Sequence, residues 1–117
     1  MNHPDYIAIL LDKTKYNCQL TRTIFHKLFP EFSQQIIDID AALANGDLKT
    51  AENITHKLHG TVSFCGFSDL QTLAQGLEVS LNVGKDDSAK YYFVALKQTI
   101  EEFLAKKECL INDPRLC

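Results

Sequence analysis

The chain has 117 residues, 45% of them hydrophobic, and a formal net charge of −3 at pH 7. This length suits one domain, and the hydrophobic fraction argues against general disorder. Lys and Arg are scattered singly, so we expect no nucleic-acid partner. No apolar run approaches the roughly 20 residues that span a bilayer, and residues 1–5 lack the start of a signal peptide. We therefore expect a single cytoplasmic domain over residues 1–117, with its core at about 17–111 and no insertion into a membrane.

The four cysteines are Cys18, Cys65, Cys109 and Cys117. Two disulfides are possible in principle, but nothing else in the sequence indicates export and no two cysteines form a C-x-x-C pair. We expect reduced thiols, with Cys18 and Cys65 packed as small apolar residues and Cys117 exposed.

Apolar residues recur at helical spacing in the first half of the chain. Pro4 suits the first turn of a short helix, and Asn17 is a candidate cap for a second, longer one. We expect a kink or short break at Pro30, because proline lacks the backbone donor, and an end at Asn45-Gly46. The inward residues predicted for these helices are Tyr6, Ile7, Leu10, Leu11, Leu20, Ile24, Leu28, Phe32, Ile36, Ile39 and Leu43. His26 is expected at the edge of this stripe, partly buried.

Two turn signals divide the second half into three further helices. Asp47 is a candidate cap for a helix that runs to about Cys65, where Gly66 stops it. Ser68 and Gln71 resemble a capping box that opens the next helix, and residues 84–87 form a turn before the last one, which we expect near Ser88. The inward residues expected for the last two helices are Leu70, Leu73, Ala74, Leu77, Leu81, Tyr92, Phe93, Leu96, Ile100 and Phe103. Order is expected to end at residues 113–114.

Short connections between long amphipathic helices favour antiparallel neighbours. The sequence therefore predicts an all-α fold, an antiparallel up-down four-helix bundle with an additional short N-terminal helix. We expect the domain to be a monomer.

The most informative segment is Thr55-His56-Lys57-Leu58-His59-Gly60-Thr61-Val62-Ser63-Phe64-Cys65-Gly66. Its inner stripe is expected to consist of Ile54, Leu58, Thr61, Val62 and Cys65. His56 lies two residues from both Ile54 and Leu58, about 200° around a helix from each, so we expect it to point outward. The residues expected beside it on the outer face are Glu52, Asn53, Gly60 and Ser63.

Gly60 stands in the middle of this helix, where glycine costs about 1 kcal/mol relative to alanine. It lies one turn after His56 on the same face. One explanation is room for another protein to bring a bulky group onto His56. The other is close packing against a neighbouring helix, which an outward position disfavours.

An exposed histidine suits phosphoryl transfer, because its ordinary pKa near 6.5 leaves a neutral nucleophilic nitrogen at cytoplasmic pH. Such transfer needs mainly in-line positioning and stabilisation of charge on the phosphoryl oxygens. The chain has no Walker-type loop, no kinase-type glycine loop and no acidic metal cluster. Those parts would have to come from a partner, and we expect no autophosphorylation from ATP.

The segment His56-Lys57-Leu58-His59-Gly60-Thr61, followed by Gly66, Leu73 and Leu77-Glu78, resembles the signature of histidine phosphotransfer (Hpt) domains. Phe29-Pro30, Leu43, Gly46-Asp47 and Ala51 extend the resemblance, which covers about residues 20–103. The sequence departs from the pattern at His59, where lysine is usual. A similar His-Lys-Leu-His-Gly run occurs in the C-terminal phosphotransfer domains of BarA/GacS-type hybrid sensor kinases.

This resemblance implies a carrier without kinase activity of its own, in which His56 receives a phosphoryl group from a receiver-domain aspartate. It implies two partners, the receiver domain of a hybrid sensor kinase and that of a response regulator. The receiver supplies Mg²⁺, so no cofactor is expected in this chain. Lys57, His59, Gly60 and Ser63 are the expected supporting residues, and Lys57 is a candidate for the local positive charge.

Three other interpretations remain open at this stage. His56 and His59, spaced i and i+3, could share a metal ion, with His3 and His26 as further candidates, although bundles usually gather such ligands inward. A second interpretation is a helical module that binds a receiver without carrying phosphate. A third is a dimerising kinase domain, which would need an ATP-binding domain that this length does not allow.

Overall fold

The computed structural model describes residues 4–117, and these residues form an all-helical fold without a strand. His3 and the first residues of the N-terminal segment lie outside the described part. The helices are α1 (Tyr6–Lys13), α2 (Cys18–Ala44), α3 (Leu48–Cys65), α4 (Ser68–Val83), α5 (Asp86–Ala105) and α6 (Lys107–Ile111), followed by the 3-10 helix η1 (Pro114–Leu116). None of the helices in residues 4–117 combines the length and apolar character that crossing a membrane requires.

Caps and glycines place most helix ends where the sequence predicts them. The side chain of Asn17 accepts a hydrogen bond from the backbone N–H of Leu20 (2.9 Å), and Asp47 accepts one from Thr50 (3.1 Å). Asn45 caps the end of α2. Gly66 ends α3 with a φ of +78°, a left-handed conformation that glycine adopts without a steric penalty.

The predicted starts of the last two long helices need correction. Ser68 and Gln71 do not form a capping box, because Phe67 is the N-cap of α4 and no side chain caps this helix end. Phe67 is fully buried, so apolar packing holds this corner instead. Helix α5 begins at Asp86, two residues before the predicted start, and acidic side chains are favourable in a first turn.

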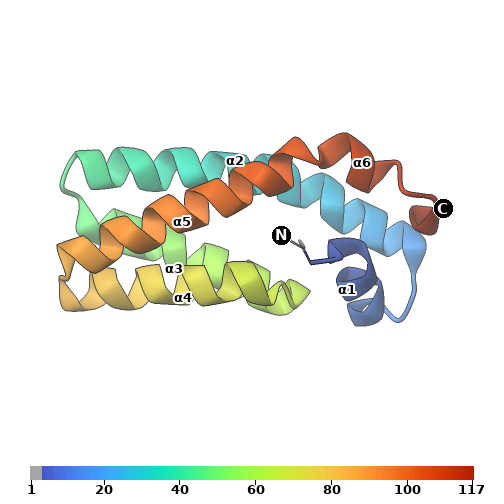
Figure 1. Ribbon diagram of the computed structural model, residues 1–117, viewed down its shortest axis with the longest axis horizontal. Coiled ribbons are helices and arrows are strands. Elements are labelled where there is room, and N and C mark those ends of the chain that lie inside the picture. Colours follow the sequence, from blue (N-terminus) through green and yellow to red (C-terminus); the bar gives the residue numbers. More distant parts are fainter. Residues whose placement is uncertain (1–3) are drawn as a thin grey trace.

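Helix α2 is continuous through Pro30, so the break allowed by the sequence does not occur. Its two halves run in different directions in Figure 1, as expected where a proline removes one backbone hydrogen bond. Phe29 directly precedes Pro30 and Phe32 follows it by two residues, and both side chains are buried. Both halves of α2 are thus anchored to the core by a buried ring close to the proline.

The inner face of the first half of α2 differs from the predicted stripe. Leu20 is 47% exposed and His26 is exposed, so both predictions of burial are wrong. Thr21 and Phe25 are buried in their place, and the hydroxyl of Thr21 donates to the backbone carbonyl of Asn17 (2.9 Å). The stripe that begins at Leu20 and the stripe that begins at Thr21 are offset by one residue, and only one of them can face the core. The stripe that contains Phe25 does so.

Helices α2, α3, α4 and α5 lie side by side and alternate in direction along the long axis of the molecule (Figure 1). Helix α1 and helix α6 cover the end at which α2 begins. Phe103 of α5 lies at the centre of the aromatic core, and its ring contacts five others, those of Tyr6, Phe25, Phe29, Phe32 and Phe67. One core therefore contains side chains from helices α1, α2 and α5 and from the N-cap residue of α4.

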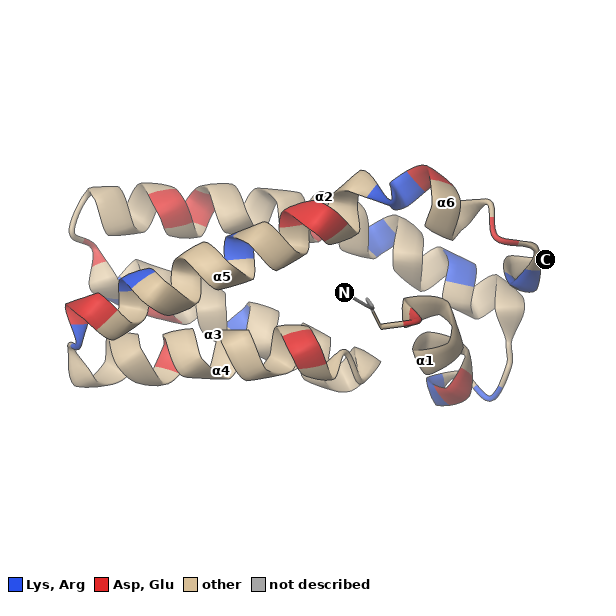
Figure 2. Cartoon of the chain, viewed as in Figure 1, with Lys and Arg blue, Asp and Glu red and all other residues tan. Residues whose placement is uncertain are grey.

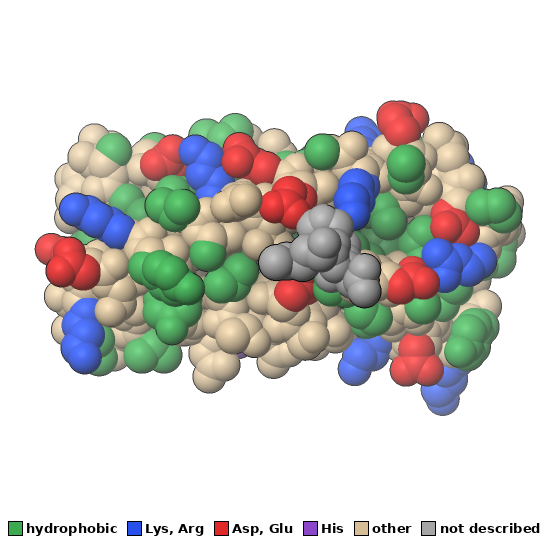
Figure 3. Space-filling view, viewed as in Figure 1, with side chains coloured by type: hydrophobic (Ala, Val, Ile, Leu, Met, Phe, Trp, Pro, Cys, Tyr) green, Lys and Arg blue, Asp and Glu red, His purple; other side chains and the backbone are tan. Residues whose placement is uncertain are grey.

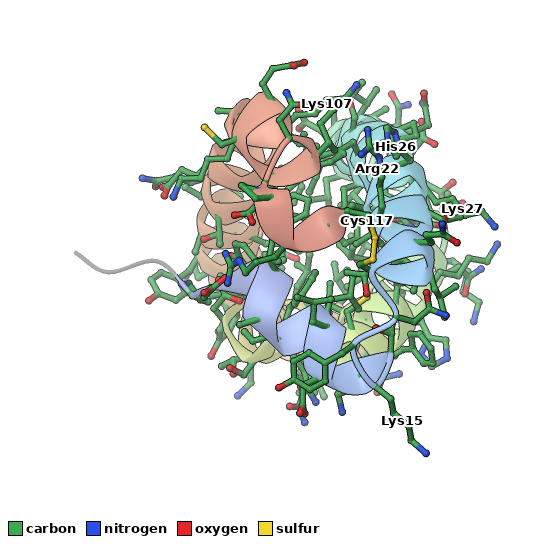
Figure 4. The ribbon with its side chains drawn as sticks, turned by 90° about the vertical axis from the view of Figure 1, so that its right-hand side faces the viewer. Lys15, Arg22, His26, Lys27, Lys107 and Cys117 are labelled. Carbon is green, nitrogen blue, oxygen red and sulfur yellow. A yellow bond between two sulfur atoms is a disulfide. The ribbon has the colours of Figure 1, made fainter. Side chains whose placement is uncertain are left out.

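The C-terminal segment stays ordered beyond the predicted end at residues 113–114. Leu116 of η1 is fully buried, and Arg115 pairs with Asp5 (2.9 Å) and Asp113 (3.0 Å). Cys117 is exposed, as predicted, but it forms a disulfide with Cys18, which Figure 4 shows in yellow between the C-terminus and α2. The prediction of reduced thiols is therefore wrong for this pair, whereas Cys65 and Cys109 are free.

We expect reduction of this disulfide to lower the free energy of unfolding by about 2–4 kcal/mol, because the bond closes a long loop and restricts the unfolded chain. The two cysteines are 99 residues apart in the sequence. Urea unfolding with and without a thiol reductant measures the difference. Cys117→Ser should unfold at the same urea concentration as the reduced wild type, with or without the reductant. Cys109→Ser should behave like the wild type. Equal unfolding midpoints for oxidised and reduced wild type would contradict the expected role of the bond.

Candidate functional site

Helix α3 presents His56 to solvent because its opposite side is committed to the core. The buried residues of α3 are Ala51, Thr55, Leu58, Val62 and Cys65. Leu58 and Val62 belong to the predicted stripe, whereas the burial of Thr55 was not predicted; its hydroxyl donates to the carbonyl of Ala51 (2.7 Å). The side chain of His56 is 74% exposed. The predicted outward orientation of His56 is confirmed.

A carboxylate from the neighbouring helix fixes one nitrogen of the His56 ring. Nδ1 of His56 lies 2.6 Å from Oε2 of Glu78, which α4 contributes. An ionised carboxylate only accepts hydrogen bonds, so Nδ1 is the donor and carries the proton. In the neutral imidazole, Nε2 then holds the free lone pair.

His59 binds the other oxygen of the same carboxylate. Its Nδ1 lies 2.8 Å from Oε1 of Glu78, and its side chain is 24% exposed. His59 is therefore more enclosed than His56 and faces α4. We call these three residues the His56–Glu78–His59 cluster.

The environment of Glu78 keeps its carboxyl group ionised. Burial raises the pKa of Glu78, but the hydrogen bonds from His56 and His59 and the charges of these imidazoles lower it by more. The pKa of Glu78 therefore lies below its usual value. This direction agrees with its role as an acceptor in both hydrogen bonds.

Gly60 stands in open space beside the cluster. A Cβ atom added at this position would meet no heavy atom within 4 Å. Close helix packing is thus excluded as the reason for glycine at this position in the isolated chain. Of the other predicted supporting residues, Lys57 is exposed and Ser63 is half-buried on α3.

Glu78 is the residue of the cluster that sequence reasoning did not assign. The sequence pointed to Leu77-Glu78 only as part of a family pattern. The one feature of the sequence that could have indicated a role for Glu78 is its position directly after Leu77, which is fully buried in α4. An acidic residue next to the buried face of a helix can contact a neighbouring helix, but the sequence pattern does not indicate which one.

The cluster lies at the molecular surface, where the side chain of His56 is 74% exposed. A groove of about 550 Å³ lies between α4 and α5, and its lining residues, Val79, Val83 and Tyr92 among them, include no member of the cluster. Hydrophobic side chains gather over α4 and α5 in the view of Figure 3. An exposed imidazole outside such a groove is suited to chemistry with a group that another protein presents.

Charged side chains of both signs are interspersed over the helices that Figure 2 shows, and no basic stripe follows any of them. Residues 4–117 also contain no group of three or more His, Cys, Asp or Glu side chains arranged to hold a metal ion. His26, one of the residues weighed as a ligand, lies on α2 and is exposed, and Figure 4 shows it among lysines and an arginine. It lies on a different helix from His56 and His59.

Comparison with known proteins identifies the family. A family model described as the Hpt domain matches residues 24–106, which is more than two thirds of the chain. The curated proteins and the solved structures that were searched contain no match to the chain. Hpt domains are phosphotransfer carriers rather than kinases, and they interact with receiver domains in phosphorelays. The chain therefore belongs to the Hpt domain family and takes part in histidine phosphotransfer in phosphorelay signalling.

Proposed function

We propose that His56 is the histidine that carries the phosphoryl group. The observation that supports this most directly is its exposed imidazole, which leaves Nε2 open to solvent while Nδ1 is engaged. His56 lies within the segment that matches the Hpt family. His26 also lies in that segment and is exposed, but no carboxylate in residues 4–117 orients its ring.

The proposed reaction needs no group beyond the two proteins and the metal ion of the partner. The Nε2 lone pair of His56 attacks the phosphorus atom of an aspartyl phosphate, forming an N–P bond as the P–O bond breaks. The receiver's aspartate leaves as a carboxylate, and its Mg²⁺ neutralises charge on the phosphoryl oxygens. The same step run backwards passes the group to a second receiver.

Gly60 supports this function through the space that it leaves. A receiver must bring its aspartate close to Nε2 in line with the transferred group, and a side chain one turn along the helix would obstruct that approach. The open surroundings of Gly60 fit this requirement. Lys57, His59 and Ser63 are the proposed supporting residues around it.

We further propose that the donor is the receiver domain of a hybrid sensor kinase and that the acceptor is the receiver of a response regulator. The His-Lys-Leu-His-Gly run at residues 56–60 supports a likeness to the phosphotransfer domains of BarA/GacS-type kinases. We place this chain as a monomeric carrier in the cytoplasm, a reducing compartment in which the Cys18–Cys117 disulfide would be open to reduction. It would have no kinase activity and no cofactor of its own.

We expect His56→Gln to abolish acceptance of the phosphoryl group and to change the free energy of unfolding by no more than about 0.5 kcal/mol, because the residue is exposed. Transfer from a phosphorylated receiver and urea unfolding measure the two effects. His26→Gln, which also replaces an exposed histidine, should transfer normally. A folded His56→Gln protein that still gains acid-labile phosphate would show that another residue is the acceptor.

We expect Gly60→Gln to slow transfer by roughly tenfold or more, since a displacement of about 1 Å in a reacting pair can cost about a hundredfold. Gly60→Ala serves as the control, because it should stabilise the helix by about 1 kcal/mol while adding little bulk. Rates from a phosphorylated receiver, compared with unfolding midpoints, separate the two effects. Wild-type transfer by Gly60→Gln would refute the steric role of Gly60.

A further inference from the structure

The Cys18–Cys117 disulfide joins a half-buried cysteine to an exposed one. Cys18 is the first residue of α2 and is half-buried, whereas Cys117 follows η1 and is exposed. The bond ties residues 112–117, which we call the closing segment, to the start of α2. A nucleophile in solution reaches the sulfur of Cys117 more readily than that of Cys18, and access decides which sulfur of a disulfide is attacked.

Non-covalent contacts also hold the closing segment in place. Leu116 is fully buried, and the guanidinium of Arg115 pairs with Asp5 (2.9 Å) and with Asp113 (3.0 Å). These contacts keep Cys117 near Cys18 after the bond has opened, and a high local concentration of one thiol beside the other favours closure of the same pair. The bond can therefore be broken and remade without rearrangement of the bundle.

The start of α2 favours negative charge on the sulfur of Cys18. Backbone N–H groups without an intrahelical partner point outward from the first turn of a helix, and such a site stabilises a thiolate. Arg22 lies one turn further along the same face of α2, and it takes part in none of the ion pairs of residues 4–117. A stabilised thiolate leaves faster in thiol–disulfide exchange, so the sulfur of Cys18 suits the role of leaving group.

Positive charge surrounds the disulfide. Residues 13–30 contain no Asp or Glu, and their basic residues and histidine are Lys13, Lys15, Arg22, His26 and Lys27. Figure 4 shows most of these side chains, together with Lys107, at the end of the molecule where the disulfide lies. Asp5 and Asp113 at the same end both pair with Arg115. A small anion that approaches the bond is therefore attracted to it.

We propose that the Cys18–Cys117 disulfide is a reversible redox site whose exchange partner is a small anionic thiol of the glutathione class. The thiolate of the small molecule attacks Sγ of Cys117 and forms a mixed disulfide, while the protein's S–S bond breaks with its electron pair on Sγ of Cys18. A second small thiolate attacks the small molecule's sulfur in the mixed disulfide and releases the thiolate of Cys117. Two small thiols are thereby oxidised to one small disulfide, and their protons and two electrons convert the bond to two protein thiols. The reverse sequence, with the small disulfide as oxidant, closes the bond.

Mass spectrometry of the folded protein in glutathione buffers tests the site of attack and the reversibility. Cys109→Ser serves as the background, because Cys109 is an exposed free thiol that would react as well. Partly reduced protein, quenched with acid, should carry glutathione on Cys117, and glutathione disulfide should afterwards close the Cys18–Cys117 bond again. Glutathione mainly on Cys18 would overturn the inference. A bond that resists an excess of glutathione in the folded protein, or that does not close again, would overturn it too.

A comparison of an anionic with a cationic reductant tests the role of the basic residues. We expect Lys15→Gln/Arg22→Gln to lower the ratio of the reduction rate with glutathione to that with cysteamine roughly threefold or more, and added salt to lower this ratio in the wild type. The ratio cancels any change in the leaving group, which affects both thiols alike.

Lys49→Gln/Lys90→Gln is the matched control, because it removes the same charge at the other end of the bundle, where α3 and α5 begin. It should keep the wild-type ratio. An unchanged ratio in a folded Lys15→Gln/Arg22→Gln protein, or an equal fall in the control, would contradict the preference for an anionic thiol. Circular dichroism and thermal melting establish that each variant is folded.

Discussion

The packing of α3 against α4 is the constraint on which the site depends. Leu58 and Val62 of α3 and Leu77 of α4 are fully buried, so neither helix can rotate without exposing them. This fixed register turns His56 outward and brings Glu78 to the same line of contact. A rotation of either helix would separate the carboxylate from the imidazoles. The arrangement of polar groups at the surface is thus a consequence of apolar packing beneath it.

Much of the fold follows from local signals in the sequence. Caps at Asn17 and Asp47 and the left-handed glycine at residue 66 place helix ends within a residue or two, because their chemistry is local. The outward orientation of His56 follows from helical spacing alone. The buried face in the first half of α2 was harder to predict, because Leu20 and Thr21 begin two neighbouring stripes. Which stripe is buried depends on packing against the aromatic core.

Contacts between segments that are distant in the chain could not be predicted from the sequence. The Cys18–Cys117 disulfide depends on the return of the C-terminal segment to the start of α2, where Leu116 is buried. The contact of Glu78 with two histidines depends on the rotation of α4 about its axis relative to α3. Periodicity gives the face of each helix, but it does not say which neighbour that face meets. Each feature therefore required the three-dimensional arrangement.

We propose that an exposed imidazole, held by one nitrogen, receives a phosphoryl group on the other. The measurement that tests it most directly is to mix the chain with a panel of phosphorylated receivers and to locate the phosphate by peptide mapping at alkaline pH, where phosphohistidine survives. The account predicts phosphate on His56 alone, carried by Nε2. Phosphate on another residue, or none from receivers that readily phosphorylate other Hpt domains, would contradict it.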